Sequence, residues 1–286
     1  MTPLSRNMLL GGASIAVAAL CAACASDLFS PDSALGKVAM VTGMAPQVDD
    51  AEEFRIGSTA AATLLGAAPL LAAPDVQKYV NRVGLHIARA GTRPDLAWEF
   101  GVLDTDTINA FAAPGGYVLI SKGLLLRLND EAELAGVLAH EITHVEQKHH
   151  LRALIQAGVV GNVASTGLSY ATGGRSAGYG GDIATKVFTN LYSKGLSRSD
   201  ELEADRRGMQ LAGRAGYDAY GLIAVLQTLD AMNASDASLT LLLKTHPAAK
   251  DRLAELNAFA ASNVPDSVDA PDGKERFRKI IAPLQR

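Results

Sequence analysis

The sequence contains only two cysteines among its 286 residues, and both lie near its start, at Cys21 and Cys24. The chain beyond that segment therefore has no disulfide and must be stabilised in another way. Aromatic residues make up only 5%, but hydrophobic residues reach 48%, a composition that argues against a disordered protein. The formal net charge of −4 leaves no basic excess to neutralise phosphates, so we expect no nucleic-acid partner.

The first 25 residues are typical of a secretory signal peptide. Arg6 is the only charged residue before Asp27, and the run from Met8 to Ala25 is apolar and ends in small residues. A run of this length is short for a full membrane span, although a retained membrane anchor is the alternative interpretation. Removing the segment takes away Arg6 and leaves a mildly acidic chain with a net charge of −5.

Two modes of signal cleavage are open. Ala23-Cys24-Ala25 fits ordinary cleavage before Ser26. Alternatively, Ala22-Ala23-Cys24 resembles the end of a bacterial lipoprotein signal, in which an acylated Cys24 would attach the chain to a membrane. That pattern usually has Leu three residues before the cysteine, where this chain has Cys21. Both modes predict an exported protein, either periplasmic or anchored by lipid to the outer membrane of a Gram-negative-type bacterium.

Beyond the signal, hydrophobic periodicity and turn residues predict a mainly helical α+β domain. A lead-in linker over residues 26–50 precedes this domain, which spans residues 51–261. We expect a helical region broken at two prolines, then three short strands, then helices almost to the end. The ranges are 52–89 (broken at Pro69 and Pro74), 98–103, 108–113 and 117–121 with a turn at 114–116, and 129–261.

Two further segments need an interpretation. The C-terminal tail, residues 262–286, has a basic patch between Lys274 and Lys279, for which we expect a short solvated helix. Residues 153–174 carry no charge, so a membrane-spanning helix, and with it a membrane-embedded protein, is one interpretation. The same stretch contains polar side chains and five glycines, which favours a packed or mobile region of loop and helix.

The first candidate site is an H-E-x-x-H motif formed by His140, Glu141 and His144. Asp130 and Glu133 have the spacing of a helix N-cap, and an apolar stripe follows at Leu134, Val137, Leu138, Ile142 and Val145. On such a helix the two imidazoles lie one turn apart, with Glu141 close to whatever they bind. Imidazole pairs at this spacing suit Zn²⁺, whereas the alternative is a surface helix with two incidental histidines.

A third ligand is expected from the segment 199–208, because catalytic zinc commonly has three protein ligands and a water. Glu201 and Asp205 are four residues apart and share a helical face with three small residues, Ala204, Gly208 and Ala212. Small residues permit a close approach to another helix, which a carboxylate needs in order to reach a metal held there. Glu203 points in another direction, which favours Glu201 as the ligand. Asp205 then fits as acceptor for the free N–H of a ligand histidine. A charged helix that faces solvent is the alternative.

Four motifs, in this order along the chain, resemble a known family. They are N-A-F-A-A-P-G-G at 109–116, H-E-I-T-H at 140–144, E-L-E-A-D at 201–205, and H-P-A-A-K-D-R at 246–252. Together they resemble the HtpX and CAAX-prenyl-protease family of zinc metalloendopeptidases, peptidase family M48, and especially its soluble exported bacterial branch. The likeness runs from about Glu52 to Leu256 and implies a gluzincin-type fold with a small sheet beside the H-E-x-x-H helix.

The resemblance also implies roles for individual residues. His140, His144 and Glu201 correspond to the ligands of one zinc ion per chain. Glu141 corresponds to the general base, and Asp205 to the residue that supports a ligand histidine.

The two flanking motifs are similar to parts of the family that bind the substrate and lie near the metal. A substrate peptide would add as a strand at the sheet edge formed by Asn109, Ala110, Phe111 and Ala112. His246 and Arg252 correspond to residues that can steady the oxyanion. In some exported members the histidine matching His246 is similar to a plug that binds zinc and holds the enzyme latent, so both roles are open.

The function implied is that of a zinc-dependent endopeptidase that cleaves unfolded or misassembled cell-envelope proteins. Zinc would activate a water, and Glu141 would take its proton and pass it to the leaving amine. The partners are then polypeptide substrates, without the docking repeats of some exported relatives. An envelope chaperone or scaffold with structural zinc is the alternative. Of the other histidines, His149 and His150 are expected to face solvent, and His86 to pack.

Overall fold

The computed structural model describes residues 48–156, 192, 195–232, 235–264 and 273–285. The chain forms two compact units, Met1–Val48 with Gln156–Gly158, and Asp49–Ile155 with Val159–Arg286. Nearly all of the first unit lies outside the described residues, as do the expected signal peptide and most of the uncharged stretch 153–174. The fold below is that of the second unit.

Two helices precede the sheet, and they confirm the predicted break at the prolines. α3 (Asp50–Ala67) is capped by Asp49, whose side chain accepts a hydrogen bond from Glu52 N at 2.8 Å. α4 (Pro74–Arg89) has proline at its first position, where the helix does not use the missing N–H. The buried residues of α4 recur at helical spacing and form the face that packs on the sheet and on α6.

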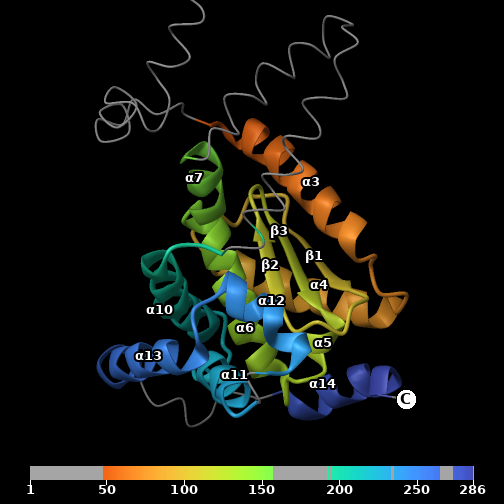
Figure 1. The fold of residues 1–286 in the computed structure, drawn as a ribbon, viewed down its shortest axis with the longest axis vertical. Helices are drawn as coiled ribbons and strands as arrows, with labels where there is room; N and C mark the ends of the chain where they lie inside the picture. The colour runs from red at the N-terminus through yellow and green to blue at the C-terminus, as the bar shows by residue number, and fades with distance from the viewer. Residues whose placement is uncertain (1–47, 157–191, 193–194, 233–234, 265–272, 286) are drawn as a thin grey trace, which may run out of the picture. The chain divides into compact units, whose positions relative to one another are not determined.

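The three predicted strands form one small mixed sheet. β1 (Glu99–Leu103) runs parallel to β3 (Tyr117–Ser121), and β2 (Ala110–Ala113) runs antiparallel to β3, so the order is β1-β3-β2. The turn between β2 and β3 requires Gly115 and Gly116, whose φ angles of 78° and 109° favour glycine. β2 is therefore an edge strand of the described sheet, and it contacts α6 (Figure 1).

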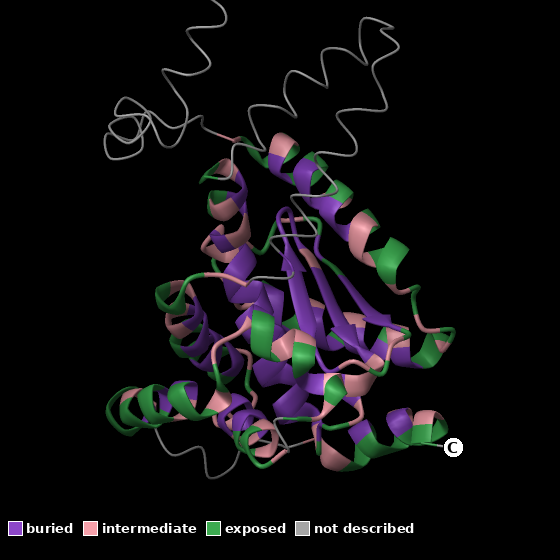
Figure 2. Cartoon of the chain, in the orientation of Figure 1, coloured by how far each residue is buried: buried purple, intermediate pink, exposed green. Residues whose placement is uncertain are grey.

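α6 (Glu131–Glu146) follows the short helix α5 (Lys122–Leu125) and carries the H-E-x-x-H motif. The predicted cap is present, because Asp130 accepts a hydrogen bond from Glu133 N at 2.9 Å. Every residue from Glu131 to Val145 is buried, as Figure 2 shows along the helix. The sheet, α4, α10 and α11 all pack against α6, so the motif lies in the interior.

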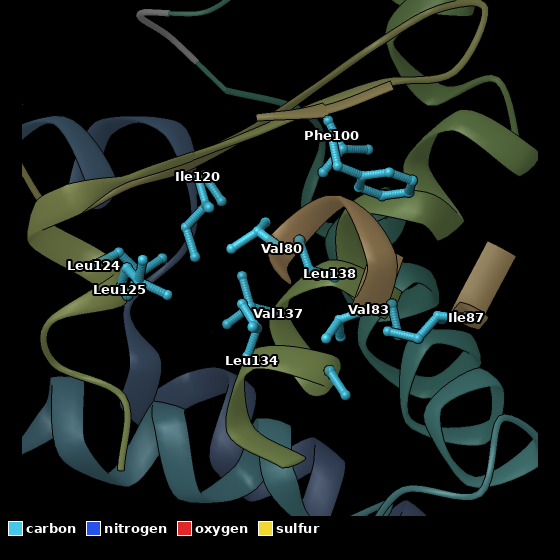
Figure 3. Close-up of a cluster of buried hydrophobic side chains, with 14 of the residues drawn as sticks. Val80, Val83, Ile87, Phe100, Ile120, Leu124, Leu125, Leu134, Val137 and Leu138 are labelled. Carbon is cyan, nitrogen blue, oxygen red and sulfur yellow. The ribbon is translucent and has the colours of Figure 1, made fainter. Parts of the chain in front are cut away.

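The main hydrophobic core lies between α4, the sheet and α6. Figure 3 shows side chains from these elements pointing toward one another, among them Val80 and Val83 of α4, Ile120 of β3, and Leu134 and Leu138 of α6. Full burial of one such aliphatic side chain contributes about 1.5 to 3 kcal/mol. Apolar packing of this kind stabilises a domain in which no disulfide was expected.

The long helical region predicted beyond residue 129 is divided into several helices. After α6 come α7 (His149–Gln156), α10 (Arg198–Arg214), α11 (Gly221–Asp230), the 3-10 turn η1 (Ala237–Leu239), α12 (Thr240–Thr245) and α13 (Ala249–Asn263). Small residues bring α10 and α11 close to α6. A Cβ on Gly208 would lie 2.9 Å from His140 Cα, and a Cβ on Gly136 would lie 2.5 Å from Leu222 N.

The C-terminal helix α14 (Lys274–Ile281) continues into the 3-10 turn η2 (Ala282–Gln285). Arg276, Arg278 and Lys279 are exposed, as the basic patch predicted. The other face of the helix is not solvated, because Phe277 and Ile281 belong to the main core and are 0% and 3% exposed. The expectation of a solvated helix is therefore wrong for that face, which packs on α4 and α6.

Membrane insertion has no support among the described helices, since none of them is both long and apolar enough to cross a bilayer. The uncharged stretch 153–174, for which a membrane span was the alternative, lies mainly outside the described residues.

Candidate metal centre

Four donor side chains from three parts of the chain converge on one space. His140 and His144 on α6, Glu201 on α10 and His246 directly after α12 present ligand atoms that all lie within 4.8 Å of one another. The Glu201 carboxylate reaches both α6 histidines, at 3.8 Å from His140 Nε2 and 3.5 Å from His144 Nε2. The structure thus brings together the three residues that the sequence singled out as ligands and adds His246 to them.

Asp205 orients the ring of His140. Its carboxylate lies 3.0 Å from His140 Nδ1, and an ionised carboxylate can only accept a hydrogen bond, so Nδ1 carries the proton and Nε2 presents a lone pair. Arg252 donates to Asp205 through Nε at 2.9 Å and through Nη2 at 2.5 Å. Burial alone would raise the pKa of Asp205, but Arg252 outweighs it and holds the pKa well below its usual range.

His144 is oriented by a second histidine. Its Nδ1 lies 2.8 Å from His149 Nδ1, and its Nε2 lies 3.1 Å from His140 Nε2. Burial lowers the pKa of His144 well below its usual value and also lowers the pKa of His149, so both rings are neutral near pH 7. When the proton of His144 points to His149, the Nε2 lone pair of His144 faces the donor group.

Glu201 brings a buried negative charge to the group. Oε2 accepts a hydrogen bond from His246 Nδ1 at 2.7 Å, whereas Oε1 is buried and has no hydrogen-bond partner in the described part of the chain. Burial alone would raise the pKa of Glu201, but His246, His140 and Arg252 lower it to about 2. A buried anionic oxygen without a partner is costly.

These donors fit a divalent metal ion. Two imidazole nitrogens and one carboxylate oxygen form a ligand set that catalytic zinc sites use. The lone pairs of His140 and His144 and the unpartnered oxygen of Glu201 face the same space, where a cation would satisfy all three.

Glu141 lies beside the donor group. It is 2% exposed and borders two crevices that His246 also lines. Burial raises the pKa of the Glu141 carboxyl, although the nearby His246 and Arg252 oppose this shift. A carboxyl group with a raised pKa can accept a proton and return it near neutral pH.

His246 and Arg252, both considered as oxyanion stabilisers, occupy different places. His246 belongs to the donor group, and Glu201 raises its pKa against the opposing effect of burial. Arg252 is 5% exposed and makes its hydrogen bonds to Asp205, with Nη2 also 3.4 Å from His140 Nδ1. The guanidinium therefore acts on the site through Asp205 and His140.

The edge of β2, where a peptide was expected to bind, is tied to this site through Asn109. Asn109 is fully buried, and its side chain donates to Thr245 Oγ1 at 3.3 Å and accepts from Ala110 N at 3.0 Å. Asn109 thus positions both the edge strand and the residue that precedes His246.

Tyr192 covers part of the same edge. Asn109 O accepts from Ser121 N on β3, so by alternation the carbonyl of Ala112 points away from the sheet. Tyr192 donates its hydroxyl to this carbonyl at 2.9 Å, and its ring packs against Phe111. A peptide added to β2 would compete with Tyr192 for Ala112 O. Sequence reasoning did not identify Tyr192, which has no motif around it.

The expectation that His149 and His150 face solvent is wrong. His149 is 1% exposed, and the His150 ring stacks on Tyr192 at a centroid distance of 5.2 Å. Burial lowers the pKa of His150 to about 3. The error arises because α6 ends at Glu146 and the chain turns at Lys148, where φ is 56°, so the α6 helical wheel does not continue. The only sequence signal was the presence of two more histidines after the motif.

Comparison with known protein families shows which family has this combination of residues. The model described as Peptidase family M48 matches residues 74–260, which include all four donors and Glu141. The chain belongs to peptidase family M48. This confirms the family and the fold class inferred from the four motifs, and membership in an M48 metalloprotease family implies a metal cofactor.

Curated relatives of this M48 chain come from bacteria and from mitochondria. It is 31% identical over 214 residues to the Beta-barrel assembly-enhancing protease of Escherichia coli (strain K12), a match that covers 71% of this chain and 43% of the relative. It is 29% identical over 185 residues to the Mitochondrial metalloendopeptidase OMA1 of Schizosaccharomyces pombe, a match that covers 63% of this chain and 52% of the relative. The chain therefore spans about half the length of the curated relatives it matches.

Proposed function

We propose that this M48 chain is a zinc-dependent endopeptidase that cleaves unfolded or misassembled proteins of the bacterial cell envelope. The observation that carries the proposal is the convergence of His140, His144 and Glu201 on one space, with Glu141 beside it. The envelope is supported by the signal-like first 25 residues and by similarity to a protein named Beta-barrel assembly-enhancing protease.

His140, His144 and Glu201 would hold one zinc ion per chain. When bound, zinc supplies a Lewis acid that lowers the pKa of water and polarises the scissile carbonyl. Asp205, held by Arg252, keeps the His140 ring in the tautomer that presents Nε2. His149 does the same for His144 by accepting its Nδ1 proton in a hydrogen bond.

Glu141 would be the general base. It would take a proton from the attacking water and deliver that proton to the leaving amine. Its raised pKa, caused by burial, reduces the cost of carrying the proton between these two steps. The substrate would lie extended along β2, because strand addition requires an unfolded or loosely held chain.

His246 would act as a fourth donor that keeps the enzyme latent. Its ring nitrogen is committed to Glu201, and its ligand atom lies within the 4.8 Å group. Catalytic zinc needs one open position, so His246 would have to move aside before a substrate is cleaved. The other role considered is donation to the oxyanion, which Nε2 of a protonated His246 could make while Nδ1 stays bonded to Glu201.

The four-donor arrangement also favours a second candidate function. Structural zinc sites are closed by four protein ligands, and His246 would complete such a set here. In that case the chain would be an envelope chaperone or scaffold, and Glu141 would have no chemical role.

Export and domain organisation are part of the proposal. Residues 1–25 would direct export and be removed, with Cys24 as the acylation site if the lipoprotein signal is used. A lead-in at 26–50, a protease domain at 51–261 and a C-terminal tail at 262–286 would follow. The chain would then act in the periplasm, or at the outer membrane if it is lipidated.

The test compares wild type with Glu141→Gln. Zinc content is measured by mass spectrometry, and cleavage of an unfolded model protein is followed with and without a chelator. We expect both proteins to hold one zinc, wild type to cleave in a chelator-sensitive way, and the variant to lose cleavage. Removal of a general base costs about 10²- to 10⁴-fold in rate. In the same assay His246→Ala should cleave faster than wild type if His246 enforces latency.

Glu255→Gln is the matched control, because Glu255 is an exposed carboxylate on α13 that lines neither crevice beside Glu141. It should retain both zinc and cleavage. Full cleavage by Glu141→Gln would remove the proposed base. Absence of cleavage from zinc-loaded wild type and from His246→Ala would favour the scaffold.

A further inference from the structure

A buried carboxylate on α3 lies against the turn that ends the edge strand β2. Glu53 is fully buried, and its Oε1 accepts a hydrogen bond from Gly115 N at 3.1 Å. Helix and turn also pack closely here, since a Cβ on Gly57 would lie 1.7 Å from Pro114 O. α3 therefore holds the backbone of the turn by one hydrogen bond and by direct contact.

The same carboxylate is bonded to two cations beside the C-terminal end of α6. Arg93 donates to Glu53 from Nη1 at 2.8 Å and from Nη2 at 3.0 Å, and Lys148 Nζ lies 3.0 Å from Glu53 Oε2. Lys148 follows α6 by two residues, and Arg93 Nη1 also donates to Val145 O of α6 at 3.3 Å. Glu53 thus connects the turn at the end of β2 with the helix that carries the H-E-x-x-H motif.

The charges in this cluster keep Glu53 ionised. Burial alone would raise the pKa of Glu53, but the hydrogen bonds from Arg93 and Lys148 outweigh burial and hold the pKa below its usual value. Asp50 adds a second carboxylate, 2.9 Å from Arg93 Nη2, so two anions face two cations. Hydrogen bonds to an ionised acceptor are about twice as strong as those between neutral groups, so the bond from Gly115 N holds the turn firmly.

The strand that this turn ends is the one on which the proposed function places the substrate. Ala110, at one end of β2, lines a crevice together with Glu141, whereas Ala113, at the other end, adjoins the turn. Asn109 fixes the end near the metal, and Glu53 fixes the end at the turn. A strand that is already ordered along its whole length binds a peptide without the entropic cost of ordering it.

We propose that Glu53 is a positioning residue for substrate binding, which acts through its hydrogen bond to Gly115 N and holds the far end of β2 ready for a long extended peptide. This inference rests on the proposed peptidase function and adds to it a selection by length. At about 3.3 Å per residue, a peptide needs about four residues on one side of the scissile bond to run along Ala110–Ala113. Peptides that end before Ala113 do not depend on Glu53.

The test measures the binding of peptides that are anchored at the metal. A labelled peptide with a hydroxamate at one end binds zinc through the two hydroxamate oxygens, so its other residues are directed along β2. Versions with two and with six residues are compared by fluorescence anisotropy. One pair has the hydroxamate at the carboxyl end and the other at the amino end, since only one direction leads to Ala113. For zinc-loaded wild type we expect the longer peptide of one pair to bind about tenfold more tightly, the factor that one or two net hydrogen bonds supply.

Two substitutions of Glu53 separate its bond to the turn from its ion pairs. Glu53→Gln and Glu53→Leu both remove the negative charge, but only the glutamine keeps an oxygen that can accept from Gly115 N. We expect Glu53→Leu to lose the gain from length and Glu53→Gln to keep most of it. The result is a ratio between two peptides, so a smaller folded or zinc-loaded fraction changes both affinities equally and leaves the ratio unchanged. A purely structural role of Glu53 would therefore not alter it.

Gly57→Ala displaces the turn while Glu53 stays intact. The new Cβ would meet Pro114 O, whereas a Cβ on Gly66, on the same helix, would meet no atom within 4 Å. Gly57→Ala should therefore lose the gain from length, and the control Gly66→Ala should keep it.

The outcomes separate this inference from the proposed function. A gain from length that Glu53→Leu and Gly57→Ala lose and Glu53→Gln keeps supports the inference, even if wild type cleaves nothing. The same gain in wild type, Glu53→Leu and Gly57→Ala overturns it, even if wild type is an active peptidase. A wild type that gains nothing from length in either direction overturns it as well.

Discussion

At the scale of single residues, the contact between His144 and His149 determines how one of the proposed metal ligands is oriented. A neutral imidazole can bind a metal through one nitrogen only when the other carries the proton. His149 Nδ1 lies 2.8 Å from His144 Nδ1, where it can accept a hydrogen bond from His144 when His144 carries its proton there. His149 Nε2 is itself buried, 3.5 Å from Glu203 and 3.7 Å from Asp200. The chain of contacts leads from the proposed ligand to carboxylates on α10.

This arrangement makes His149 a positioning residue, and two substitutions test it. His149→Leu removes the acceptor, and we expect zinc affinity to fall about 10- to 100-fold, the usual effect of losing a group that orients a ligand histidine. His149→Asn keeps an oxygen acceptor near the place of Nδ1 and should retain most of the affinity. Competition with a zinc-binding dye measures both.

His86→Leu is the control for that comparison, because His86 is an exposed histidine on α4 that bonds to Ala215 O, far along the chain from the donors. Equal zinc affinity of His149→Leu and His86→Leu would show that the hydrogen bond to His144 does not position the ring.

At the scale of helices, the site exists because α10 and α6 approach closely enough for a short carboxylate to reach two imidazoles. A Cβ on Gly208 would lie 2.9 Å from both Cα and N of His140. Those atoms are backbone inside a buried helix, so neither helix can yield without moving the ligands. The small residue on α10 therefore sets the distance between Glu201 and His140.

Gly208→Ala should accordingly lower both stability and metal affinity. We expect a loss of about 1 to 3 kcal/mol in the free energy of unfolding, as for other overpacked interiors, and weaker zinc binding because Glu201 is displaced from His140 and His144. Urea denaturation and dye competition measure the two effects. Gly66→Ala is the control, because a Cβ at this helical position on α3 would meet no atom within 4 Å.

The control should behave in the opposite way. Alanine is a better helix former than glycine by about 0.5 to 1 kcal/mol, so Gly66→Ala should stabilise the protein slightly and leave zinc affinity unchanged. If Gly208→Ala matched Gly66→Ala in both measurements, the close approach of the helices would not control the site.

The helices, strands and turns that depend on neighbouring residues in the sequence could be predicted from it. The Asp130 cap, the proline break before α4 and the Gly115-Gly116 turn all act within a few residues, and each was visible as a pattern. The spacing of His140, Glu141 and His144 was equally local, and one helical face of α10 identified Glu201.

Contacts between distant residues were not predictable in this way. Glu53 reads as a surface residue in the acidic first turn of α3, yet it is fully buried and bonds to Arg93 Nη1 at 2.8 Å and to Gly115 N at 3.1 Å. Burial of the Phe277 face of α14 likewise depends on where the tail packs. Neither the identity nor the spacing of these residues indicates their partners.

At the scale of the whole molecule, one carboxylate joins four separate parts of the chain. Glu131, the first residue of α6, accepts hydrogen bonds from Tyr79 of α4 at 2.6 Å and from Tyr217 after α10 at 3.1 Å. Arg276 of α14 donates to both carboxylate oxygens, through Nε at 2.6 Å and also through Nη2. The helix that carries the metal motif is thereby fixed at its start by the C-terminal helix.

The hydrogen bonds to the Glu131 carboxylate should make the free energy of unfolding depend on pH. Burial alone would raise the pKa of Glu131, but the hydrogen bonds from Arg276 and Tyr79 outweigh burial and lower it. A carboxyl group whose pKa is lower in the folded than in the unfolded state stabilises the fold above its unfolded pKa of about 4.3. This contribution is lost as the pH falls through the folded value.

We therefore expect Glu131→Gln to lower the free energy of unfolding by about 2 kcal/mol at pH 7, the typical worth of hydrogen bonds to a charged group. The difference between wild type and variant should begin to shrink below the unfolded pKa of about 4.3. It should vanish once the pH lies below the lower pKa of the folded state, where Glu131 is protonated whether the protein is folded or unfolded. Urea denaturation at several pH values, at equal zinc content, measures it. The other acidic groups titrate in the same way in both proteins, so their contributions cancel in the difference between the two free energies of unfolding.

Glu275→Gln is the control, because Glu275 lies on the exposed face of α14. Its free energy of unfolding should equal that of wild type at every pH. A constant difference from pH 7 to pH 3 would mean that Glu131 acts through packing and not through its charge.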